Sequence, residues 1–427
     1  MLDLKRIREE PDEVRRRLAR RGKPEFVEQI DQLLTLDETR RSVIARVDQA
    51  RARRNEVSPQ VGKLKQAGNH QEAEPLILEM RALGDEMEAL EKQRTELEET
   101  VRSMLLQIPN LREDVVPEGD ESTNQEIRTW GEPARFDFEP RPHWELAERL
   151  GMLDLPRGTK ITGSGFPLYM GAGARLERTM IQLMLDLHTR EHGYTEVLPP
   201  FMINEQSALG TGHLPKFGED MYHVPLDGFY LVPTAEVPVT NLLSGELLDG
   251  QALPIKYVAY TPCFRREAGA HGKDTRGLLR VHQFDKVELV RFERFECGPP
   301  ALEELTAHAE RVLQLLGLTY RVVRLATGDL GFSNAHTYDL EVWSPGVQKW
   351  LEVSSCSLYN DYQARRANIR YRPEPGAKPE FVATLNGSAL ALARTYAALL
   401  ETHQQKDGSI KLPEPMAGYF GADRIVA

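Results

Sequence analysis

The chain has 427 residues, a formal net charge of −11, 41% apolar residues and 28% charged residues. This composition excludes disordered and fibrous proteins, and the acidic balance argues against a general nucleic-acid-binding protein. Three separated cysteines disfavour a disulfide framework and a cysteine zinc site, and the lack of a long apolar run or an apolar N-terminal segment favours a multi-domain cytoplasmic protein.

Two N-terminal segments have heptad spacing. Apolar residues recur in a 4-3 rhythm over residues 43–64 and again over residues 76–104, with Arg54 and Arg94 each filling one seam position. Apolar seams of this period predict coiled-coil helices. Because the turn-like residues 67–70 lie between them, we expect an antiparallel hairpin. Ser58-Pro59 should interrupt and kink its first helix.

The two arms of this hairpin differ in charge. Residues 40–65 contain eight Lys or Arg and two acidic residues, whereas residues 72–99 contain ten acidic residues and three Lys or Arg. About 28 residues per arm would extend roughly 40 Å. The alternative is two helices packed on a globular body, which the charged outer faces disfavour.

The composition changes after the second helix. Ile108-Pro109-Asn110 should end this helix, and proline and glycine recur from residue 117 to residue 142, as is typical of a linker. We therefore expect an N-terminal helical domain at residues 1–110 with a coiled-coil arm at about 35–104, a linker at 111–142, and a second domain at 143–427.

The second domain mixes helix and strand patterns. Periodicity predicts helices at residues 175–192, 302–316 and 388–400, and strands at 195–198, 284–290 and 350–354. Because strands and helices do not alternate regularly, a doubly wound parallel sheet is disfavoured. The expected class is α+β, with an antiparallel sheet flanked by helices.

Four polar constellations in this domain could support chemistry, and the first is Thr261–Glu267. An extended chain would place Arg265 and Glu267 on one face. An arginine next to an acid suits a ligand in which an anionic phosphate lies next to a hydrogen-bond donor. Residues 268–280 follow with several basic side chains and suit a polyanion. A solvated surface hairpin is an equally good explanation of that loop.

The second and third constellations lie on predicted strands. Phe284, Lys286 and Glu288 share one strand face, although a half-exposed strand is the simpler explanation. Further on, Glu352 next to hydroxyl groups could hold a hard cation such as Mg²⁺. An ideal strand points Glu352 and Ser355 to opposite faces, so a shared site requires a bend or bulge there.

The fourth constellation is Thr384–Arg394. We expect a strand ending at Leu385 and a helix beginning near Gly387, with Asn386 as its N-cap and its free N–H groups facing an anion. Arg394, about two turns later, would point to the same side. An ordinary core helix with one exposed arginine is the alternative.

Signatures of other enzyme classes are absent. The sequence has no GxxxxGK[ST] or complete GxGxxG phosphate loop and no GxSxG nucleophile elbow. His188 and His192 have a spacing that zinc ligands use, but an amphipathic helix explains them more simply.

Taken in order, the segments TPCFRRE, VHQFDKVEL, LEVSSCS and LNGSALALAR closely resemble the catalytic motifs of class II aminoacyl-tRNA synthetases. They are most similar to those of the seryl-tRNA synthetase family. The segment Pro233–Glu236 and the heptad hairpin extend the resemblance nearly end to end. The class I signatures HIGH and KMSKS are absent.

This resemblance implies four groups of site residues. Serine would contact Thr234, Ala235, Glu236, Glu288 and Ser388. ATP would contact Arg265, Arg266, Glu267, Val281, Phe284, Glu352, Val353, Ser354, Ser355 and Arg394. Arg265 and Arg394 would be the catalytic residues, on the α-phosphate and the triphosphate end, while Phe284 would stack on adenine. Glu352 and Ser355 would bind Mg²⁺, and no zinc is implied.

The resemblance also implies a reaction and partners. The enzyme would activate L-serine with ATP to seryl-adenylate, releasing pyrophosphate, and transfer serine to tRNA(Ser), with tRNA(Sec) left open. The heptad arm and the 268–280 loop would bind tRNA, and residues 175–200 would form the interface of a homodimer. No membrane partner is implied.

Three other functions compete with this interpretation. An inactive relative would act only by binding, but the polar motif positions here retain usable chemistry. A ligase that loads an amino acid onto a carrier protein would not need a basic heptad arm. An archaeal-type serine enzyme with zinc-bound substrate lacks a Cys/His ligand set in this sequence.

Overall fold

A computed structural model of the chain describes residues 1–268 and 276–427. It divides into two units, one formed by residues 2–109 and the other by residue 1 and residues 110–427. Among the described residues, no helix combines the length and the apolar character needed to cross a membrane. The predicted basic loop falls largely on residues 269–275, which lie outside the described residues.

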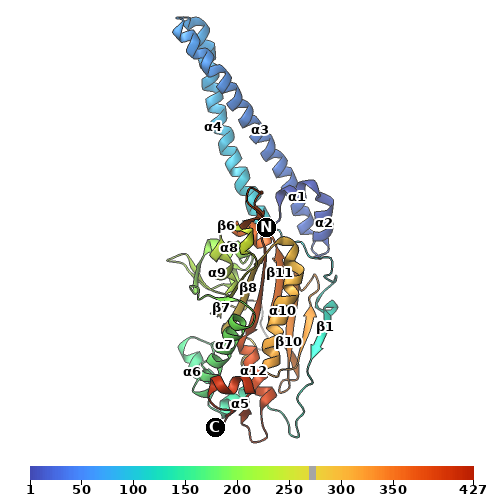
Figure 1. Cartoon of the computed structure of the whole chain (residues 1–427). Helices are drawn as coiled ribbons and strands as arrows, with labels where there is room; N and C mark the ends of the chain where they lie inside the picture. The colour runs from blue at the N-terminus through green and yellow to red at the C-terminus, as the bar shows by residue number, and fades with distance from the viewer. Residues whose placement is uncertain (269–275) are drawn as a thin grey trace. The chain divides into compact units, whose positions relative to one another are not determined.

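The N-terminal unit is entirely helical (Figure 1). Its helices are α1 (Leu4–Glu9), α2 (Pro11–Ala19), α3 (Glu25–Gln66) and α4 (His70–Gln107). Helices α3 and α4 lie side by side as a hairpin. Gly68 has a φ of +79° in the turn between them, a conformation that glycine adopts without a steric penalty.

The apolar seam of the hairpin follows the predicted heptads. Val43 and Val47 of α3 form a core cluster with Leu90 and Leu97 of α4. Other buried seam residues are Ala50, Val57 and Val61 of α3 and Ala73, Val101 and Leu105 of α4. The predicted pair of heptad helices is therefore confirmed.

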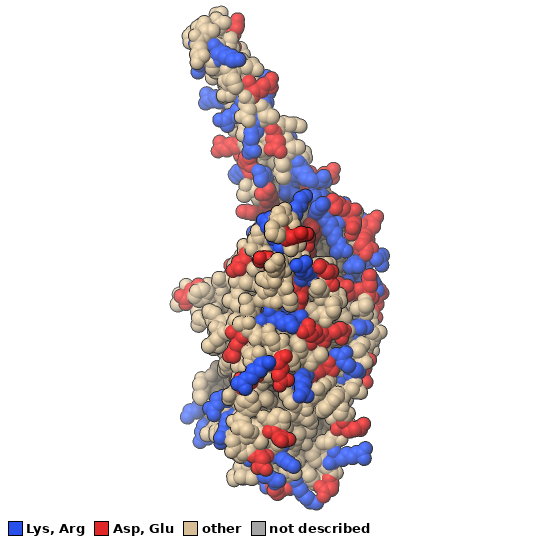
Figure 2. All heavy atoms as spheres, viewed as in Figure 1, with Lys and Arg blue, Asp and Glu red and all other residues tan. Residues whose placement is uncertain are grey.

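Ion pairs between the two helices explain their opposite charges. Arg46 contacts Glu86 at 2.9 Å, and Arg51 contacts Glu91 at 3.0 Å. Arg53 makes a third pair with Glu79 at 2.7 Å. These side chains are exposed, and Figure 2 shows basic and acidic groups interspersed along the hairpin. Because exposed pairs stabilise by only about 0–1 kcal/mol each, the apolar seam dominates the packing.

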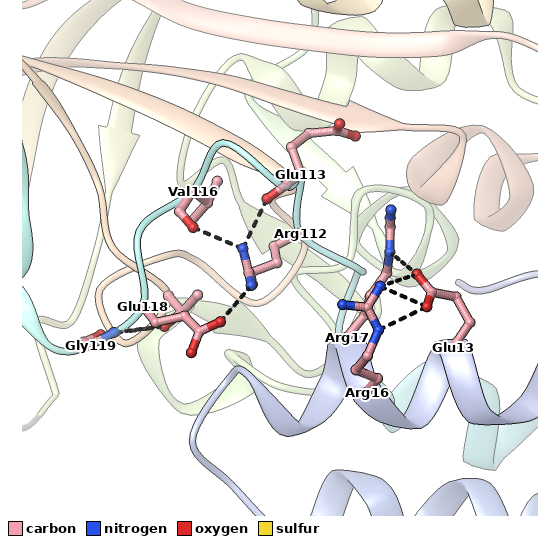
Figure 3. A network of polar contacts seen from close by, with 9 residues as sticks. Glu13, Arg16, Arg17, Arg112, Glu113, Val116, Glu118 and Gly119 are labelled. Atoms are coloured by element: carbon pink, nitrogen blue, oxygen red, sulfur yellow. Dashed lines mark hydrogen bonds and ion pairs between the residues drawn. The ribbon is translucent and has the colours of Figure 1, made fainter.

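Local charge pairing also organises the helix before the hairpin. On α2, Glu13 accepts hydrogen bonds from Arg16 and Arg17 (Figure 3). These hydrogen bonds lower the pKa of Glu13. Spacings of three and four residues bring these groups together on one helix face.

Ser58-Pro59 does not end the helix, because α3 continues through Pro59 to Gln66, and the kink expected there stays a prediction. Proline removes one N–H donor, which leaves the Asn55 carbonyl without its helical partner. Asn55 is exposed, so that carbonyl can bond to water, while Val57 and Val61 keep their places in the seam.

The larger unit is built on an eight-stranded sheet in the order β1-β9-β10-β11-β14-β8-β7-β2. Its strands are β1 (Gln125–Trp130), β2 (Thr195–Glu196), β7 (Ile255–Phe264), β8 (Gln283–Glu293), β9 (Tyr320–Arg324), β10 (His336–Ser344), β11 (Lys349–Asn360) and β14 (Ala383–Ala391). All neighbours are antiparallel except β2 and β7. The predicted α+β class with an antiparallel sheet is confirmed.

Helices cover both faces of this sheet. Val287 and Leu289 of β8 belong to the main core with α7 (Ala172–Arg190), α10 (Gly298–Leu315) and α12 (Leu392–His403). The alternate residues Val290 and Phe292 belong to a smaller core with α9 (Glu236–Thr240) and α11 (Tyr362–Ala367). The other helices are α5 (His143–Arg149), α6 (Leu155–Ile161), α8 (Glu205–Thr211) and α13 (Glu414–Phe420). The small strands are β3 (Met202–Asn204), β4 (His223–Val224), β5 (Phe229–Leu231), β6 (Leu247–Asp249), β12 (Arg370–Arg372), β13 (Glu380–Phe381), β15 (Ile410–Lys411) and β16 (Arg424–Ile425).

The segment predicted as a linker is more ordered than expected. Its strand β1 pairs with β9 at the edge of the sheet. Before it, the Asn110 amide donates to the carbonyls of Ser333 and Tyr359 at 2.9 and 2.8 Å. The Arg112 guanidinium donates to the carbonyls of Glu113 and Val116 (Figure 3). The bonds of Asn110 join groups that are distant in sequence, and composition does not reveal such contacts.

The predicted transition from strand to helix near Gly387 is also wrong. Strand β14 runs to Ala391, and α12 begins at Leu392, so Asn386 is not an N-cap. Because β14 pairs with both β8 and β11, its backbone hydrogen bonds are made in the sheet. A Cβ at Gly387 would lie 2.5 Å from a methyl of Leu305, so only glycine fits this packing against α10.

Candidate active site

One pocket of about 500 Å³ in the larger unit brings most of the predicted site residues together. The predicted residues that line it are Thr234, Glu236, Arg265, Glu267, Val281, Phe284, Glu288, Glu352, Val353, Ser354, Ser355, Ser388 and Arg394. They come mainly from the strands β8, β11 and β14 and from the start of α12, while Arg265 and Glu267 follow the end of β7. A pocket of this size suits a nucleotide-sized ligand.

Two predicted residues lie elsewhere. Ala235 is fully buried in the smaller core beside Val239. The Arg266 guanidinium lies over the Tyr222 ring, 4.5 Å from its centroid, and donates to the Met221 carbonyl at 3.2 Å. The side chains of Ala235 and Arg266 are therefore not part of the pocket wall.

A buried charge pair occupies one end of the pocket. The Lys286 ammonium contacts the Glu288 carboxylate and donates to the Thr234 hydroxyl at 2.6 Å. Burial raises the pKa of Glu288, while Lys286 acts in the opposite direction. Phe284, Lys286 and Glu288 all line the pocket, which confirms the predicted period of two along β8. This corner can bind an ammonium group and a hydroxyl group.

A second acid stands beside that pair. The Gln363 amide donates to Glu236 at 2.6 Å, and the Thr384 hydroxyl donates to the Gln363 carbonyl at 2.7 Å. Burial raises the pKa of Glu236, against the effects of Lys286 and Gln363. The hydrogen-bonded chain fixes the carboxyl group, so the corner is preorganised.

Two arginines also line the pocket. The Arg265 guanidinium lies 5.3 Å from the centroid of the Phe284 ring, and its Nε donates to the Pro233 carbonyl at 3.2 Å. Arg394, near the start of α12, donates to the Glu352 carbonyl at 2.8 Å and to the Leu279 carbonyl at 3.0 Å. The two guanidinium groups suit the phosphates of a nucleotide, and the aromatic ring suits its nucleobase.

The chain after β7 reaches the pocket by a different conformation from the one predicted. The strand ends at Phe264, and Glu267 has a φ of +51°, so the segment is not extended to Glu267. Arg265 and Glu267 nevertheless both line the pocket, and Glu267 is paired with Arg280. The ion pair holds the acid in this conformation.

A bulge in β11 brings Glu352 and Ser355 to the same pocket. Leu340 of β10 pairs with Ser354 and its neighbour Glu341 pairs with Glu352, so Val353 is left without a partner. One extra residue reverses the alternation of the side chains. The bulge required by the sequence argument is therefore present.

The oxygen ligands around this bulge fit a hard divalent cation. The Ser355 hydroxyl donates to the Asp339 carboxylate at 2.7 Å. Burial raises the pKa of Asp339 well above its usual range, and the nearby Glu352 raises it further. In the described chain no three His, Cys, Asp or Glu residues form a metal-binding group. A cation here would therefore need oxygens from substrate or water as well, as Mg²⁺ commonly does.

Sequence reasoning missed several pocket residues. They include His213, Asn334 and Tyr359, together with Asp339 behind Ser355, whereas Arg280 and Asn386 were expected in a polyanion-binding loop and as an N-cap. Asp339 could have been found from the sheet pairing. It lies on β10 directly opposite Ser355 of the predicted strand β11. His213 follows a short helix in a loop, where no periodicity applies.

Models of known protein families match both units of the chain. The model described as "Seryl-tRNA synthetase N-terminal domain" matches residues 1–112. The model described as "tRNA synthetase class II core domain (G, H, P, S and T)" matches residues 222–403.

Relatives match over the full chain. The serine–tRNA ligase of Carboxydothermus hydrogenoformans is 55% identical over 100% of this chain and 99% of its own length. That of Gemmatimonas aurantiaca is 53% identical over 99% of each chain.

Solved structures agree in fold. Seryl-tRNA synthetase from Pyrococcus horikoshii, complexed with ATP, has a TM-score of 0.94 and 37% identity, covering 100% of this chain and 99% of its own. The cytoplasmic serine–tRNA ligase from Naegleria fowleri, in complex with AMP, has a TM-score of 0.87 and 26% identity, covering 97% of this chain and 96% of its own. With the two family matches and the full-length relatives, this agreement shows that the chain belongs to the seryl-tRNA synthetase family.

Proposed function

We propose that the pocket binds L-serine at its acidic corner and ATP at its arginine end, so that the two substrates meet between them. As a member of the seryl-tRNA synthetase family, the chain is an enzyme, a serine–tRNA ligase. It activates L-serine with ATP to seryl-adenylate and transfers serine to the 3′ end of tRNA. The observation that supports our assignment of the site is the single pocket that joins Glu236 and Glu288 to Arg265 and Arg394.

The acidic corner is proposed as the serine site. Glu288 and Thr234 would receive the amino and hydroxyl groups of serine, and Glu236 and Ser388 would complete the wall. Ala235 would act only through its backbone and its packing, since its side chain is buried in the core.

The proposed ATP site uses the arginine end. Arg265 would hold the α-phosphate, Arg394 the triphosphate end, and Phe284 would stack on adenine. Glu267 would contact the adenine edge. The remaining contacts would come from Val281, Glu352, Val353, Ser354 and Ser355. The Arg266 side chain is left out of the proposal because it lies on Tyr222.

Adenylation at this site would depend on position and charge. The serine carboxylate is already ionised at neutral pH, so it can attack the α-phosphate without a protein nucleophile or base. Arg265 and Arg394 would orient the phosphates and stabilise the charge that develops. Glu288 would exclude alanine and glycine, because a buried acid without its hydroxyl partner is costly. Threonine would be excluded by its extra methyl, an effect of about 1–3 kcal/mol.

We propose Mg²⁺ as the divalent cation, held by Glu352 and Ser355 with Asp339 behind them. When bound, the ion supplies neutralisation of phosphate charge. All three donors are oxygens, which favour Mg²⁺ over zinc.

The proposed macromolecular partners are tRNA(Ser) and a second copy of the chain, in the cytoplasm. The basic residues 40–65 of α3 suit the phosphate backbone of tRNA, and the 268–280 loop remains a proposed second contact. Exposed apolar side chains follow α7 and extend over the small β3-β5-β4 sheet, which supports a homodimer through this region. They are Leu198, Phe201, Met202, Leu226 and Phe229.

ATP–pyrophosphate exchange tests the proposed site. With Mg²⁺ and each of the twenty amino acids, exchange should be greatest with serine and far lower with threonine, alanine and glycine. Greatest exchange with alanine or glycine would indicate a carrier-protein ligase instead. A folded protein without exchange would act as a non-catalytic relative, and the site assignments would be wrong.

A further inference from the structure

His213 is a pocket residue to which the proposed reaction assigns no role. It lies in the loop after α8 and lines the pocket together with Thr234 and Lys286. Arg265 and Lys286 are the pocket cations whose charges act on its ring. His213 therefore stands where the proposed serine corner meets the proposed α-phosphate site.

The loop holds this side chain in a defined place. The His213 N–H donates to the Ala208 carbonyl at 3.0 Å, and the Phe217 N–H donates to the His213 carbonyl at 2.7 Å. Before it, Gly212 has a φ of +88°, and a Cβ there would lie 2.3 Å from the Ser333 hydroxyl. Only glycine fits that position.

A second layer fixes the loop from outside. The Arg366 guanidinium donates to the carbonyls of Leu209 and Leu214 at 3.1 and 3.2 Å. The Gln363 amide, which also holds Glu236, donates to the Thr211 carbonyl at 3.2 Å. His213 and the proposed serine-binding acid are thus positioned by one shared side chain.

The contact at His213 Nδ1 bears on which of the two ring nitrogens carries the proton. The Thr211 hydroxyl lies 2.9 Å from His213 Nδ1, whereas its other acceptor, the Ser207 carbonyl, is 3.4 Å away. A hydroxyl can accept from Nδ1–H or donate to Nδ1, and we assign the Thr211 hydroxyl as the donor. In a neutral ring the proton then lies on Nε2, which becomes a donor toward the pocket.

The ring is neutral at physiological pH. Burial, together with the charges of Arg265, Lys286 and Arg366, lowers the pKa of His213 to about 3. A neutral donor can bind an anion here without adding a third positive charge beside Arg265 and Lys286.

We propose that His213 donates a hydrogen bond from Nε2 to the carboxylate of bound serine and holds it for attack on the α-phosphate of ATP. This inference rests on the proposed function of the pocket. The α-phosphate is the other anion near the same place, so the test separates the two.

The test compares His213→Ala and His213→Gln with the wild type in ATP–pyrophosphate exchange. His213→Ala should raise the KM for serine about ten- to hundredfold, as expected for a lost hydrogen bond to a charged group, and change the KM for ATP less than twofold. His213→Gln presents a side-chain amide donor and should recover most of the loss. Arg135→Ala, at an exposed position outside the pocket and outside the β3-β5-β4 sheet, is the control and should leave both constants unchanged.

Serinol, which keeps the amino and hydroxyl groups of serine but has no carboxylate, tests the contact directly. Its inhibition constant against serine should be the same in the wild type and in folded His213→Ala, as checked by circular dichroism. Equal weakening of serine and serinol would show a merely structural role and overturn the inference. A rise confined to the KM for ATP would place the contact on the α-phosphate and also overturn it, as would an unchanged KM for serine.

Arg265→Ala separates this inference from the proposed function. If Arg265→Ala abolishes exchange and His213→Ala leaves the KM for serine unchanged, only the role of His213 fails. If Arg265→Ala retains wild-type exchange, the proposed site itself fails.

Discussion

Arg265 is the single side chain on which the proposed chemistry depends most. It bonds to the backbone at Pro233 and lies over Phe284, so its guanidinium is held before substrate arrives. Preorganised charge of this kind is effective because the protein does not have to reorganise during the reaction.

Arg265→Ala should therefore reduce serine-dependent exchange about 10²- to 10³-fold, the usual effect of removing one group that stabilises a transition state. The secondary structure and the unfolding temperature should change little. Initial rates of exchange at saturating serine, with circular dichroism, measure both. Arg135→Ala, at an exposed position outside the pocket, is the control. Near-normal exchange in Arg265→Ala would remove Arg265 from the mechanism.

At the residue scale, sequence patterns predicted the pocket residues that lie on regular strands. Phe284, Lys286 and Glu288 follow from a period of two, and the bulge at Val353 follows from requiring Glu352 and Ser355 to meet. His213 could not be predicted in this way, because its position depends on hydrogen bonds to Ala208 and to more distant side chains.

At the scale of helices and strands, contact between α7 and α10 places three histidines together. His188 Nδ1 lies 2.9 Å from His192 Nδ1, and the His192 ring stacks on His308 with centroids 4.0 Å apart. Burial, together with the charge of His192, lowers the pKa of His308 to about 4. Glu304, Lys256 and Arg291 also act on His308, and Tyr194 shares a hydrogen bond with it.

This cluster predicts a loss of stability in mild acid. Below a pH of about 6.5 the unfolded chain binds a proton at His308 that the folded protein does not bind until pH falls to about 4. The free energy of unfolding should therefore fall by about 3 kcal/mol across that range through His308 alone. His308→Gln, which does not titrate, should lose correspondingly less stability.

Urea unfolding at pH 7, 5.5 and about 4.5 measures this difference between the wild type and His308→Gln. His223→Gln, at an exposed site, should keep the wild-type pH dependence. Parallel pH dependence in the wild type and in His308→Gln would contradict the prediction.

Among elements, the sequence predicted long periodic segments best. The hairpin helices and the strands β8 and β11 appear where expected, although β8 and β11 extend further. The short apolar run in β14 was predicted as helix because its alanines favour that state, but pairing on both edges makes it a central strand. Strand β1 was not predicted, because its pattern is weak and its partner β9 lies far along the chain.

At the scale of the whole molecule, the units have different proposed tasks. Serine activation is assigned to residues within 110–427, and tRNA binding to the hairpin within 2–109. Replacing Val43–Val101 with a short glycine linker should leave exchange near the wild-type rate and abolish aminoacylation of tRNA(Ser). Loss of exchange would show that adenylation needs the hairpin, and retained aminoacylation would contradict its proposed role.

A milder variant distinguishes charge from shape. Arg54, Lys63 and Lys65 are exposed on α3 and form no ion pair with any part of the chain that the structure describes. Changing all three to Gln should raise the KM for tRNA and flatten its salt dependence, since each lost phosphate contact removes roughly 0.7–0.9 from the logarithmic salt slope. The same change at the paired Arg46, Arg51 and Arg53 should have a smaller effect. Equal effects of the two sets would argue against direct phosphate contact.

The hairpin also bears on how this enzyme can acquire new partners. Apart from the first residue, residues 2–109 leave the catalytic unit at a single covalent junction, between Pro109 and Asn110. The seam residues that stabilise the hairpin lie within it, and the pocket is lined from Gly331, Arg265 and other residues beyond that junction. If the hairpin binds tRNA as proposed, recombination at this junction would replace the RNA-binding unit and leave the residues of the pocket unchanged.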